Sequence, residues 1–188
     1  MIRLGILGST RGTHLLSLIE AIQKKELDAS IEIVISNRAE ALILERAKTN
    51  QLNTKFIDAK GLSREQYDDL ISKTLKLFNV ELVVLIGFMR ILSSAFVKEW
   101  ENKIINVHPS LLPNFAGKMD LDVHRAVLHA RSKETGCTVH YVTEEVDGGA
   151  AIIQKRCEVK ETDTIESLKT RVQALESMAL VEAIQELI

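Results

Sequence analysis

The chain has 188 residues and a formal net charge of −2, from 24 Lys and Arg against 26 Asp and Glu. At 46% hydrophobic residues it can bury a full core, which excludes a disordered protein, and the balanced charge excludes a general nucleic-acid binder. The longest nearly unbroken apolar run, 82–89, is far below the ~20 residues that span a bilayer, and the first residues lack the pattern of a secretory signal. We therefore expect a cytoplasmic protein with no membrane partner.

Short runs rich in Ile and Val alternate along the chain with longer segments whose apolar residues recur every three or four positions. This pattern predicts strands separated by amphipathic helices, and such alternation is typical of a parallel sheet. The predicted strands cover 4–7, 31–36, 55–58, 82–86, 104–107, 138–142 and 152–157. The predicted helices cover 13–24, 40–48, 63–78, 123–130 and 165–187.

The third predicted helix has the clearest local signal. Ser63, followed three residues later by Gln66, has the form of a capping box at the start of a helix. We expect this helix to bury Leu70, Ile71, Thr74 and Leu77.

The segment 82–86 is apolar on both faces, as a central parallel strand must be when helices cover both sides of its sheet. No repeat, linker or composition break divides the chain. We therefore predict an α/β fold with a single domain over 1–188, in which one doubly wound, mostly parallel sheet has helices on both faces. Ligands of such sheets bind beyond the carboxyl ends of the strands.

The first loop at such an end runs from Gly8 to His14 and opens a helix. Its glycines, Gly8 and Gly12, do not fit GxGxxG, and the GxxxxGK of a P-loop is absent, so a dinucleotide site is poorly supported. Two interpretations remain open. Either the helix terminus binds a phosphate, or the loop is a tight turn in which Gly12 or Thr13 caps the helix.

A second candidate site lies where the only two prolines of the chain occur, in NVHPSLLP at 106–113. Proline stiffens the backbone there, at the end of a predicted strand. Asn106 and His108 are two apart, so their side chains point to the same side of the strand and together suit one oxyanion. The alternatives are a buried histidine bonded to backbone and an asparagine that caps the strand.

A third candidate is Asp147, in the sequence Val-Asp-Gly-Gly at 146–149. This sequence is first of all a turn signal. If the turn lies beside His108, the carboxylate would favour the charged imidazole and order a water molecule. Thr138 and His140 either line the same cleft or have structural hydrogen bonds. We place His124 and His129 on a helix surface, and no histidine has the spacing of a metal site.

Together, NVHPSLLP at 106–113 and CTVHYVTEEVDGGAAIIQ at 137–154 resemble the folate-dependent formyltransferases. LIGFMRIL at 85–92 and SNRAEALILERA at 36–47 support the resemblance, which spans nearly the whole chain. It is closest to members that formylate glycinamide ribonucleotide in purine biosynthesis. The first loop departs from the family, which usually has Gly-Ser-Asn where Gly12, Thr13 and His14 stand, and the stretch 118–123 is longer than in many members.

The resemblance implies an enzyme with a direct-transfer mechanism. The amine of glycinamide ribonucleotide would attack the formyl carbon of 10-formyltetrahydrofolate, which serves as co-substrate, and no metal takes part. Asn106 and protonated His108 would stabilise the oxyanion. Asp147 would keep the imidazole charged and position a water molecule for proton transfer from the amine.

The resemblance also implies which residues bind the two small-molecule substrates. The residues implied for folate are Arg64, Met89, Arg90, Ile91, Leu92 and Asn106. Those implied for the ribonucleotide are Gly12, Thr13, His14, Gln173 and Glu176. Outside the resemblance, Met89, Ile91 and Leu92 read as ordinary core residues, and the sequence leaves the oligomeric state open.

Three other functions compete with this one. A methionyl-tRNA formyltransferase would need a further basic domain for tRNA, for which 188 residues leave no room. A formyltetrahydrofolate deformylase, which is a hydrolase, typically has a regulatory domain before the first strand. A non-catalytic nucleotide-binding α/β module would leave Asn106, His108 and Asp147 without a role.

Overall fold

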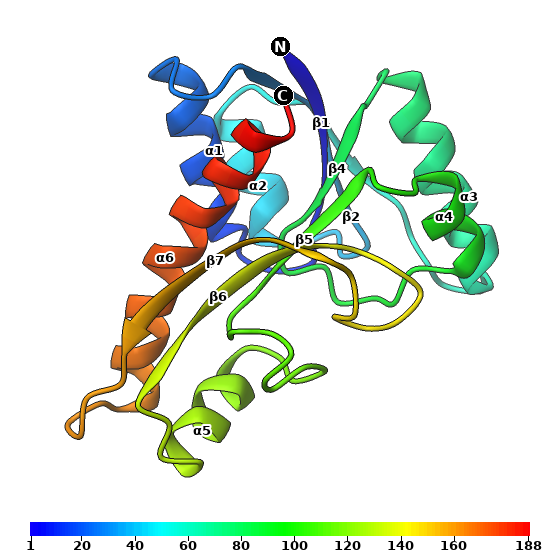
Figure 1. Ribbon diagram of the computed structural model, residues 1–188. Coiled ribbons are helices and arrows are strands. Elements are labelled where there is room, and N and C mark those ends of the chain that lie inside the picture. The colour runs from blue at the N-terminus through cyan, green and yellow to red at the C-terminus, as the bar shows by residue number, and fades with distance from the viewer. The chain divides into compact units, whose positions relative to one another are not determined.

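A computed structural model describes residues 1–188 as seven strands and six helices (Figure 1). The strands are β1 (Ile2–Leu7), β2 (Ala29–Ser36), β3 (Thr54–Phe56), β4 (Leu82–Leu85), β5 (Ile104–His108), β6 (Glu134–Tyr141) and β7 (Ala151–Glu158). The helices are α1 (Thr13–Gln23), α2 (Leu42–Thr49), α3 (Arg64–Leu77), α4 (Ser94–Glu99), α5 (Leu121–His129) and α6 (Ile165–Glu186). The strand order is β3-β2-β1-β4-β5-β6-β7, and the chain forms two compact units, 1–106 with 188, and 107–187.

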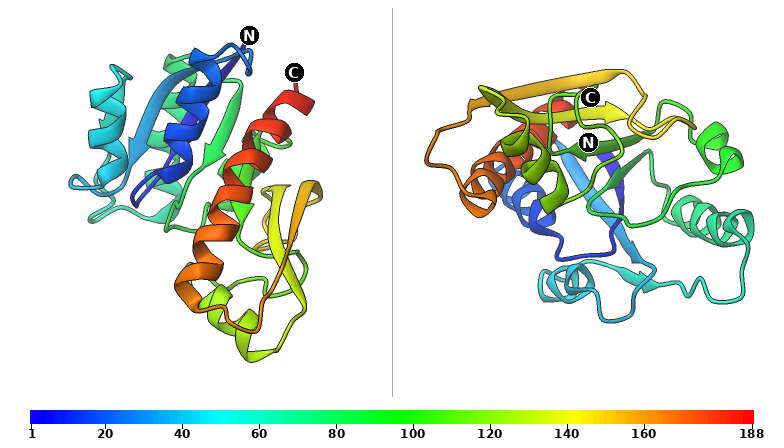
Figure 2. Two further views of the ribbon diagram at one scale, coloured as in Figure 1. Left: turned by 90° about the vertical axis from the view of Figure 1, so that its left-hand side faces the viewer. Right: turned by 90° about the horizontal axis from the view of Figure 1, so that it is seen from below.

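The first unit is the doubly wound part of the fold. Its strands pair in parallel, with β1 between β2 and β4 and with β4 next to β5. Helix α1 packs with α2, and α3 packs with α4. These two pairs lie on opposite sides of the strands (Figures 1 and 2), so β1 and β4 are buried on both faces. The predicted α/β class, with a mostly parallel sheet and helices on both faces, is confirmed.

The loops after β1 and β4 leave neighbouring strands at their carboxyl ends. The chain winds from β1 to β2 in one direction and reaches β4 on the other side of β1, which makes this the switch point of the sheet. Open α/β sheets bind ligands at such a point. The two loops are in contact, since the Ser9 amide donates a hydrogen bond to the Gly87 carbonyl at 3.0 Å.

The second unit is built on an antiparallel strand pair. Strands β6 and β7 pair from Glu134 with Glu158 to His140 with Ala151. Helix α6 packs on both strands and on α5. Its N-cap residue is Thr164, whose side chain forms a capping box with Ser167. None of the helices in either unit is long and apolar enough to cross a membrane.

The predicted elements are all present, but the buried face of α3 differs from the prediction. The Ser63–Gln66 capping box is confirmed. Leu70 and Leu77, however, are 42% and 76% exposed, whereas Tyr67, Ile71 and Leu75 are fully buried. These three lie four apart on a single stripe, which the more scattered apolar residues of the helix obscured. The six-residue helix α4 was not predicted, since one turn and a half carries little periodicity.

Candidate active site

The segment after β5 is held by side chains from β6 and β7. The Thr138 hydroxyl donates to the Ser110 carbonyl at 2.7 Å and accepts from the Leu112 amide at 3.0 Å. The Gln154 amide donates to the Leu112 carbonyl at 2.9 Å. Of the two interpretations of Thr138, the structural one is therefore confirmed. These bonds fix the backbone that follows the strand end.

Asn106 and His108 both belong to β5. Asn106 is half-buried and lies opposite Leu85 of β4, whereas His108 is 5% exposed. The positions are two apart in a regular strand, so they share a face, as the sequence predicted.

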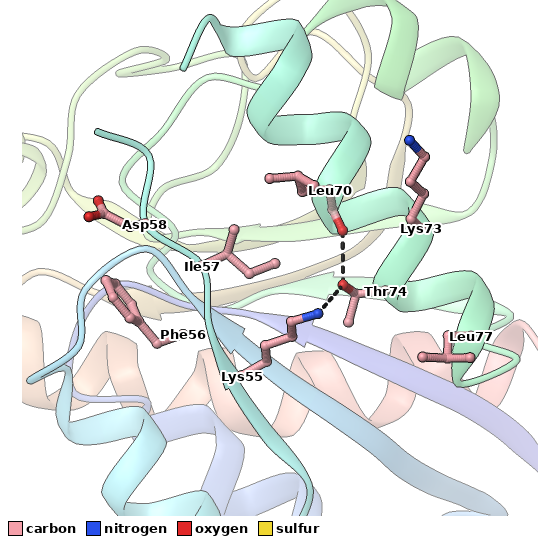
Figure 3. A pocket seen from close by; sticks show the side chains of 8 residues that line it. All are labelled: Lys55, Phe56, Ile57, Asp58, Leu70, Lys73, Thr74 and Leu77. Carbon is pink, nitrogen blue, oxygen red and sulfur yellow. Dashed lines mark hydrogen bonds between the residues drawn. The ribbon is translucent and has the colours of Figure 1, made fainter. Parts of the chain in front are cut away.

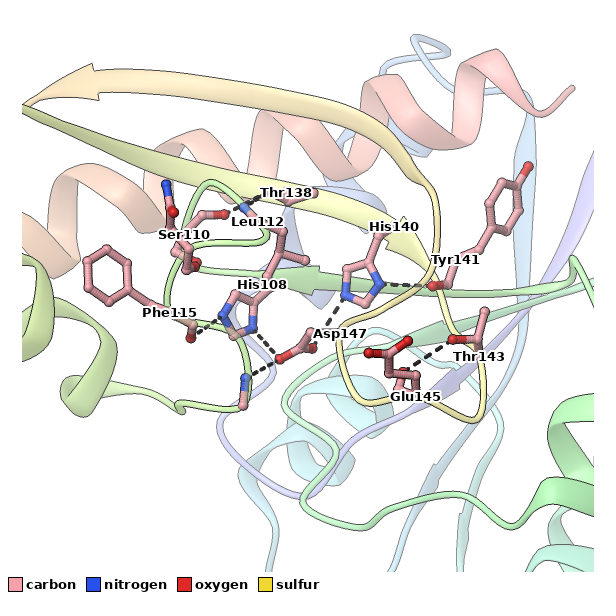
Figure 4. Close-up of polar contacts among 12 residues, drawn as sticks. His108, Ser110, Leu112, Phe115, Thr138, His140, Tyr141, Thr143, Glu145 and Asp147 are labelled. Atoms are coloured by element: carbon pink, nitrogen blue, oxygen red, sulfur yellow. Dashed lines mark hydrogen bonds and ion pairs between the residues drawn. The ribbon is translucent and has the colours of Figure 1, made fainter.

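Asp147 lies beside His108 (Figure 4). Its Oδ2 is 3.4 Å from His108 Nδ1 and accepts a hydrogen bond from the Gly117 amide at 2.8 Å. Asp147 has a left-handed backbone with φ 55°, in a turn where the Gly148 amide donates to the Glu145 carbonyl at 3.2 Å. The turn is thus real, as the local sequence indicated, and it also brings the carboxylate to the imidazole.

Both ring nitrogens of His108 face oxygen acceptors. Nδ1 faces the Asp147 carboxylate, and Nε2 lies 3.3 Å from the Phe115 carbonyl (Figure 4). A neutral imidazole has one N–H and can donate to only one of them, whereas an imidazolium donates to both. Only the imidazolium form of His108 can therefore donate to both acceptors at once, and this is the form that stabilises an oxyanion.

A second imidazole faces the other oxygen of Asp147. His140 Nε2 is 3.6 Å from Asp147 Oδ1, and Nδ1 is 2.9 Å from the Tyr141 carbonyl. His140 is 2% exposed, and this burial lowers its pKa, against the opposing effects of the Tyr141 carbonyl and Asp147. Asp147 thus lies between His108 and His140, and burial lowers the pKa of His140.

The loop after β1 forms the N-terminal end of α1. Gly12, the N-cap residue, has φ 66°, and a Cβ there would lie 2.4 Å from Ile43 Cγ1, so no other residue fits. No side chain caps the helix. Thr13 is exposed and His14 is 9% exposed. The loop is therefore the tight turn of one interpretation, although no side chain caps the helix, and the phosphate site of the other stays a prediction.

The segment after β4 exposes two apolar side chains to solvent. Met89 and Ile91 are 38% and 59% exposed, and only Leu92 is buried. The Arg90 guanidinium lies over the Tyr67 ring, 4.5 Å from its centroid. Met89 and Ile91 are thus not core residues. Arg64, at the start of α3, is exposed.

Helix α6 carries Gln173, which is half-buried, and Glu176, which is 5% exposed. Glu176 faces His124 of α5, whose pKa is lowered by burial and raised in part by Glu176. His124 is 1% exposed, so its predicted place on a helix surface is wrong. The cause is the packing of α5 on α6, which turns this side of α5 inward.

A shallow groove lies between β3 and α3, with a volume of about 440 Å³ (Figure 3). Two of its polar side chains are linked: Lys55 Nζ donates to Thr74 Oγ1 at 3.0 Å, and that hydroxyl donates to the Leu70 carbonyl at 2.9 Å. None of the predicted site residues lines it. It is lined by Lys55, Phe56, Ile57, Asp58, Leu70, Lys73, Thr74 and Leu77.

Two hydrogen bonds could not be predicted from the sequence. The Gly117 amide donates to the Asp147 carboxylate, and the Met89 amide donates to the Ser9 hydroxyl at 2.8 Å. The first involves a backbone group that no motif marks. The second joins residues that are 80 positions apart.

A mostly parallel sheet whose fifth strand ends on a histidine beside a carboxylate places this chain among the α/β proteins. The comparisons are more specific. The family described as Formyl transferase matches residues 2–184, and the chain belongs to this family.

The chain is 45% identical over 185 residues to the trifunctional purine biosynthetic protein adenosine-3 of Gallus gallus, covering 98% of this chain but 18% of the relative. The chain thus spans less than a fifth of the length of this relative. It is 38% identical over 177 residues to the phosphoribosylglycinamide formyltransferase of Haemophilus influenzae, covering 94% of this chain and 82% of the relative. The crystal structure of glycinamide ribonucleotide transformylase 1 from Symbiobacterium toebii matches with a TM-score of 0.92 and 38% identity, over 98% of this chain and 86% of that one.

Proposed function

We propose that this protein transfers the formyl group of 10-formyltetrahydrofolate to the amine of glycinamide ribonucleotide, a step of purine biosynthesis, in the cytoplasm. We further propose that residues 1–188 act as one formyltransferase domain. The name of the Haemophilus influenzae relative, which aligns over most of its length, supports formyl transfer to glycinamide ribonucleotide. The observation that carries the proposal is the pair formed by His108 and Asp147 at the end of β5.

In the proposed reaction the amine nitrogen attacks the formyl carbon, and the carbonyl oxygen becomes an oxyanion. The Asn106 carboxamide and His108 Nε2–H donate to it, which lowers the energy of the tetrahedral intermediate. The Phe115 carbonyl, 3.3 Å from Nε2, is a long and weak acceptor that a charged oxyanion replaces.

The proton of the attacking amine must reach the folate nitrogen before the intermediate breaks down. We assign its transfer to a water molecule ordered by Asp147, whose carboxylate also favours the charged His108. The bond between carbon and the folate nitrogen then breaks, the oxyanion returns to a carbonyl, and the products are tetrahydrofolate and the formylated amine. No covalent enzyme intermediate is needed.

The two substrates are assigned to separate groups of residues. For the ribonucleotide phosphate we propose Gly12, Thr13 and His14, because they form the N-terminal end of α1 and a helix N-terminus favours an anion. Gln173 and Glu176 are the further residues that we assign to the ribonucleotide. For folate we propose Arg64, the segment 89–92 and Asn106, and the exposure of Met89 and Ile91 supports this assignment.

The test is to mix the protein with 10-formyltetrahydrofolate and to follow deformylated folate with and without glycinamide ribonucleotide. Product that forms only in the presence of the amine supports the transferase. Product at the same rate without the amine would instead mean a deformylase, and no product in either arm would mean a non-catalytic module. The His108→Ala variant is the matched control for contaminating activity.

A further inference from the structure

Ser9 is a buried hydroxyl that the proposed reaction does not use. It lies in the loop after β1 and is 2% exposed. Its Oγ donates a hydrogen bond to Asn37 Oδ1 at 2.6 Å and accepts one from the Met89 amide at 2.8 Å. The side chain therefore joins the loop after β1 to the segment after β4.

The direction of these two bonds is fixed. A serine hydroxyl has one proton, and Ser9 uses it in the hydrogen bond to the side-chain carbonyl of Asn37. The lone pairs of Ser9 Oγ are then left for the Met89 N–H. Asn37 thus orients the hydroxyl, and Ser9 in turn holds the first amide of the segment 89–92.

The backbones of the two loops also fit closely together. The Ser9 amide donates to the Gly87 carbonyl at 3.0 Å. Gly87 has φ 58°, and a Cβ there would lie 2.3 Å from Thr10 Oγ1. The two loops are thus linked by the Ser9–Gly87 and Met89–Ser9 hydrogen bonds and by the close approach of Thr10 to Gly87, so a shift of one loop strains these contacts with the other.

We propose that Ser9 is a positioning residue that couples the binding of the two substrates. This inference rests on the proposed function, which puts the phosphate at residues 12–14, three positions after Ser9, and folate at residues 89–92. A phosphate that immobilises the first loop also immobilises Ser9 and, through it, the Met89 amide. The second substrate then binds to a segment that is already ordered, which gives positive coupling.

The experiment uses glycinamide ribonucleotide with tetrahydrofolate, a pair that cannot react because no formyl group is present. Calorimetry gives the Kd of the ribonucleotide without and with saturating tetrahydrofolate. For the unmodified protein we expect the Kd to fall about 10-fold in the presence of the folate, within the usual range of coupling between sites. For Ser9→Ala we expect the ratio of the Kd without folate to the Kd with folate to be below about 2, because the two loops lose the hydrogen bonds of the Ser9 side chain.

Ser36→Ala is the matched control. Ser36 is also a fully buried serine at a strand end, and its hydroxyl accepts a bond from the Arg38 amide at 3.1 Å. Removing it deletes the same kind of group, so a general loss of stability would show here too. We expect this variant to keep the 10-fold ratio.

Asn37→Ala is a second variant that leaves Ser9 in place. It should destabilise the fold less than Ser9→Ala does, since Asn37 is only half-buried. It frees the hydroxyl proton, so we expect a ratio between those of Ser9→Ala and the unmodified protein. Two results would overturn the role of Ser9 without touching the proposed function. One is a Kd ratio that neither Ser9→Ala nor Asn37→Ala changes, and the other is a Kd ratio of 1 in the unmodified protein. An unmodified protein that binds neither molecule would overturn the proposed function together with it.

Discussion

At the scale of single residues, the chemistry depends on what faces each nitrogen of His108. Acceptors lie on both sides of the ring, and only an imidazolium donates to both of them at once. We propose Asn106, on the same face of β5, as a second and neutral donor. Oxyanion stabilisation needs these two donors in place before the substrate arrives.

The first prediction concerns these donors. Asn106→Ala and His108→Ala should each lower kcat for formyl transfer by about 100-fold or more, the scale of one lost oxyanion donor. Circular dichroism and thermal unfolding should show that both variants remain folded. Turnover close to that of the unmodified enzyme in either variant would argue against the mechanism.

The second prediction concerns Asp147. An amide cannot carry the negative charge that the Asp147 carboxylate places 3.4 Å from His108 Nδ1, so Asp147→Asn should change the acidic limb of the pH profile of kcat/KM and lower its maximum. Initial rates between pH 5 and 9 at low substrate would measure this. A profile of unchanged shape would remove the role of Asp147 beside His108.

At this scale the sequence predicted what strand geometry decides locally. Asn106 and His108 share a face because they are two apart. The place of Asp147 depends on how the turn at 146–149 folds back, which the residues themselves left open and the family resemblance implied. Ser9 and the Gly117 amide could not be predicted, since each meets its partner only through the tertiary fold.

At the scale of elements, we propose that the N-terminal end of helix α1 binds the phosphate of the ribonucleotide. Gly12 opens this helix without a side-chain cap, and the positive end of the helix dipole lies there. The third prediction is that the dephosphorylated ribonucleoside binds much more weakly than glycinamide ribonucleotide, because it has no charge to place there. Equal Kd values by calorimetry would exclude a phosphate site at residues 12–14.

The elements themselves were largely predictable, because alternating strands and helices leave strong periodic signals. The exceptions have physical causes. Helix α4 is too short for a period to show, and α3 buries the stripe that contains Tyr67 and Leu75 and exposes Leu70 and Leu77. Which stripe is buried depends on the neighbouring strands and on α4, and these contacts exist only in the folded unit.

At the scale of the whole molecule, the buried histidines make stability depend on pH. Burial lowers the pKa of His140, which faces Asp147 and His108, and of His124, which faces Glu176, Lys169 and Asp120. In the unfolded chain both return to the ordinary value of 6.5. Below that pH the unfolded chain binds more protons than the folded protein, so acid favours unfolding.

The fourth prediction is therefore that the free energy of unfolding falls as the pH drops below about 6.5, and that His124→Leu reduces this dependence by up to about 1.4 kcal/mol per pH unit. His124 suits the test because its Nδ1 has no hydrogen-bond partner to lose. Urea unfolding at several pH values between 5 and 8 measures the slope. An identical slope in the variant, or greater stability in acid, would contradict the prediction.

The central claim is that His108 and Asp147 act together on one intermediate, and the most direct measurement is kcat for His108→Ala, Asp147→Asn and the double variant. Groups that act as a unit are strongly non-additive, so the double variant should be about as slow as the slower single variant. If the two losses instead multiply, the carboxylate and the imidazole work independently, and the account is wrong.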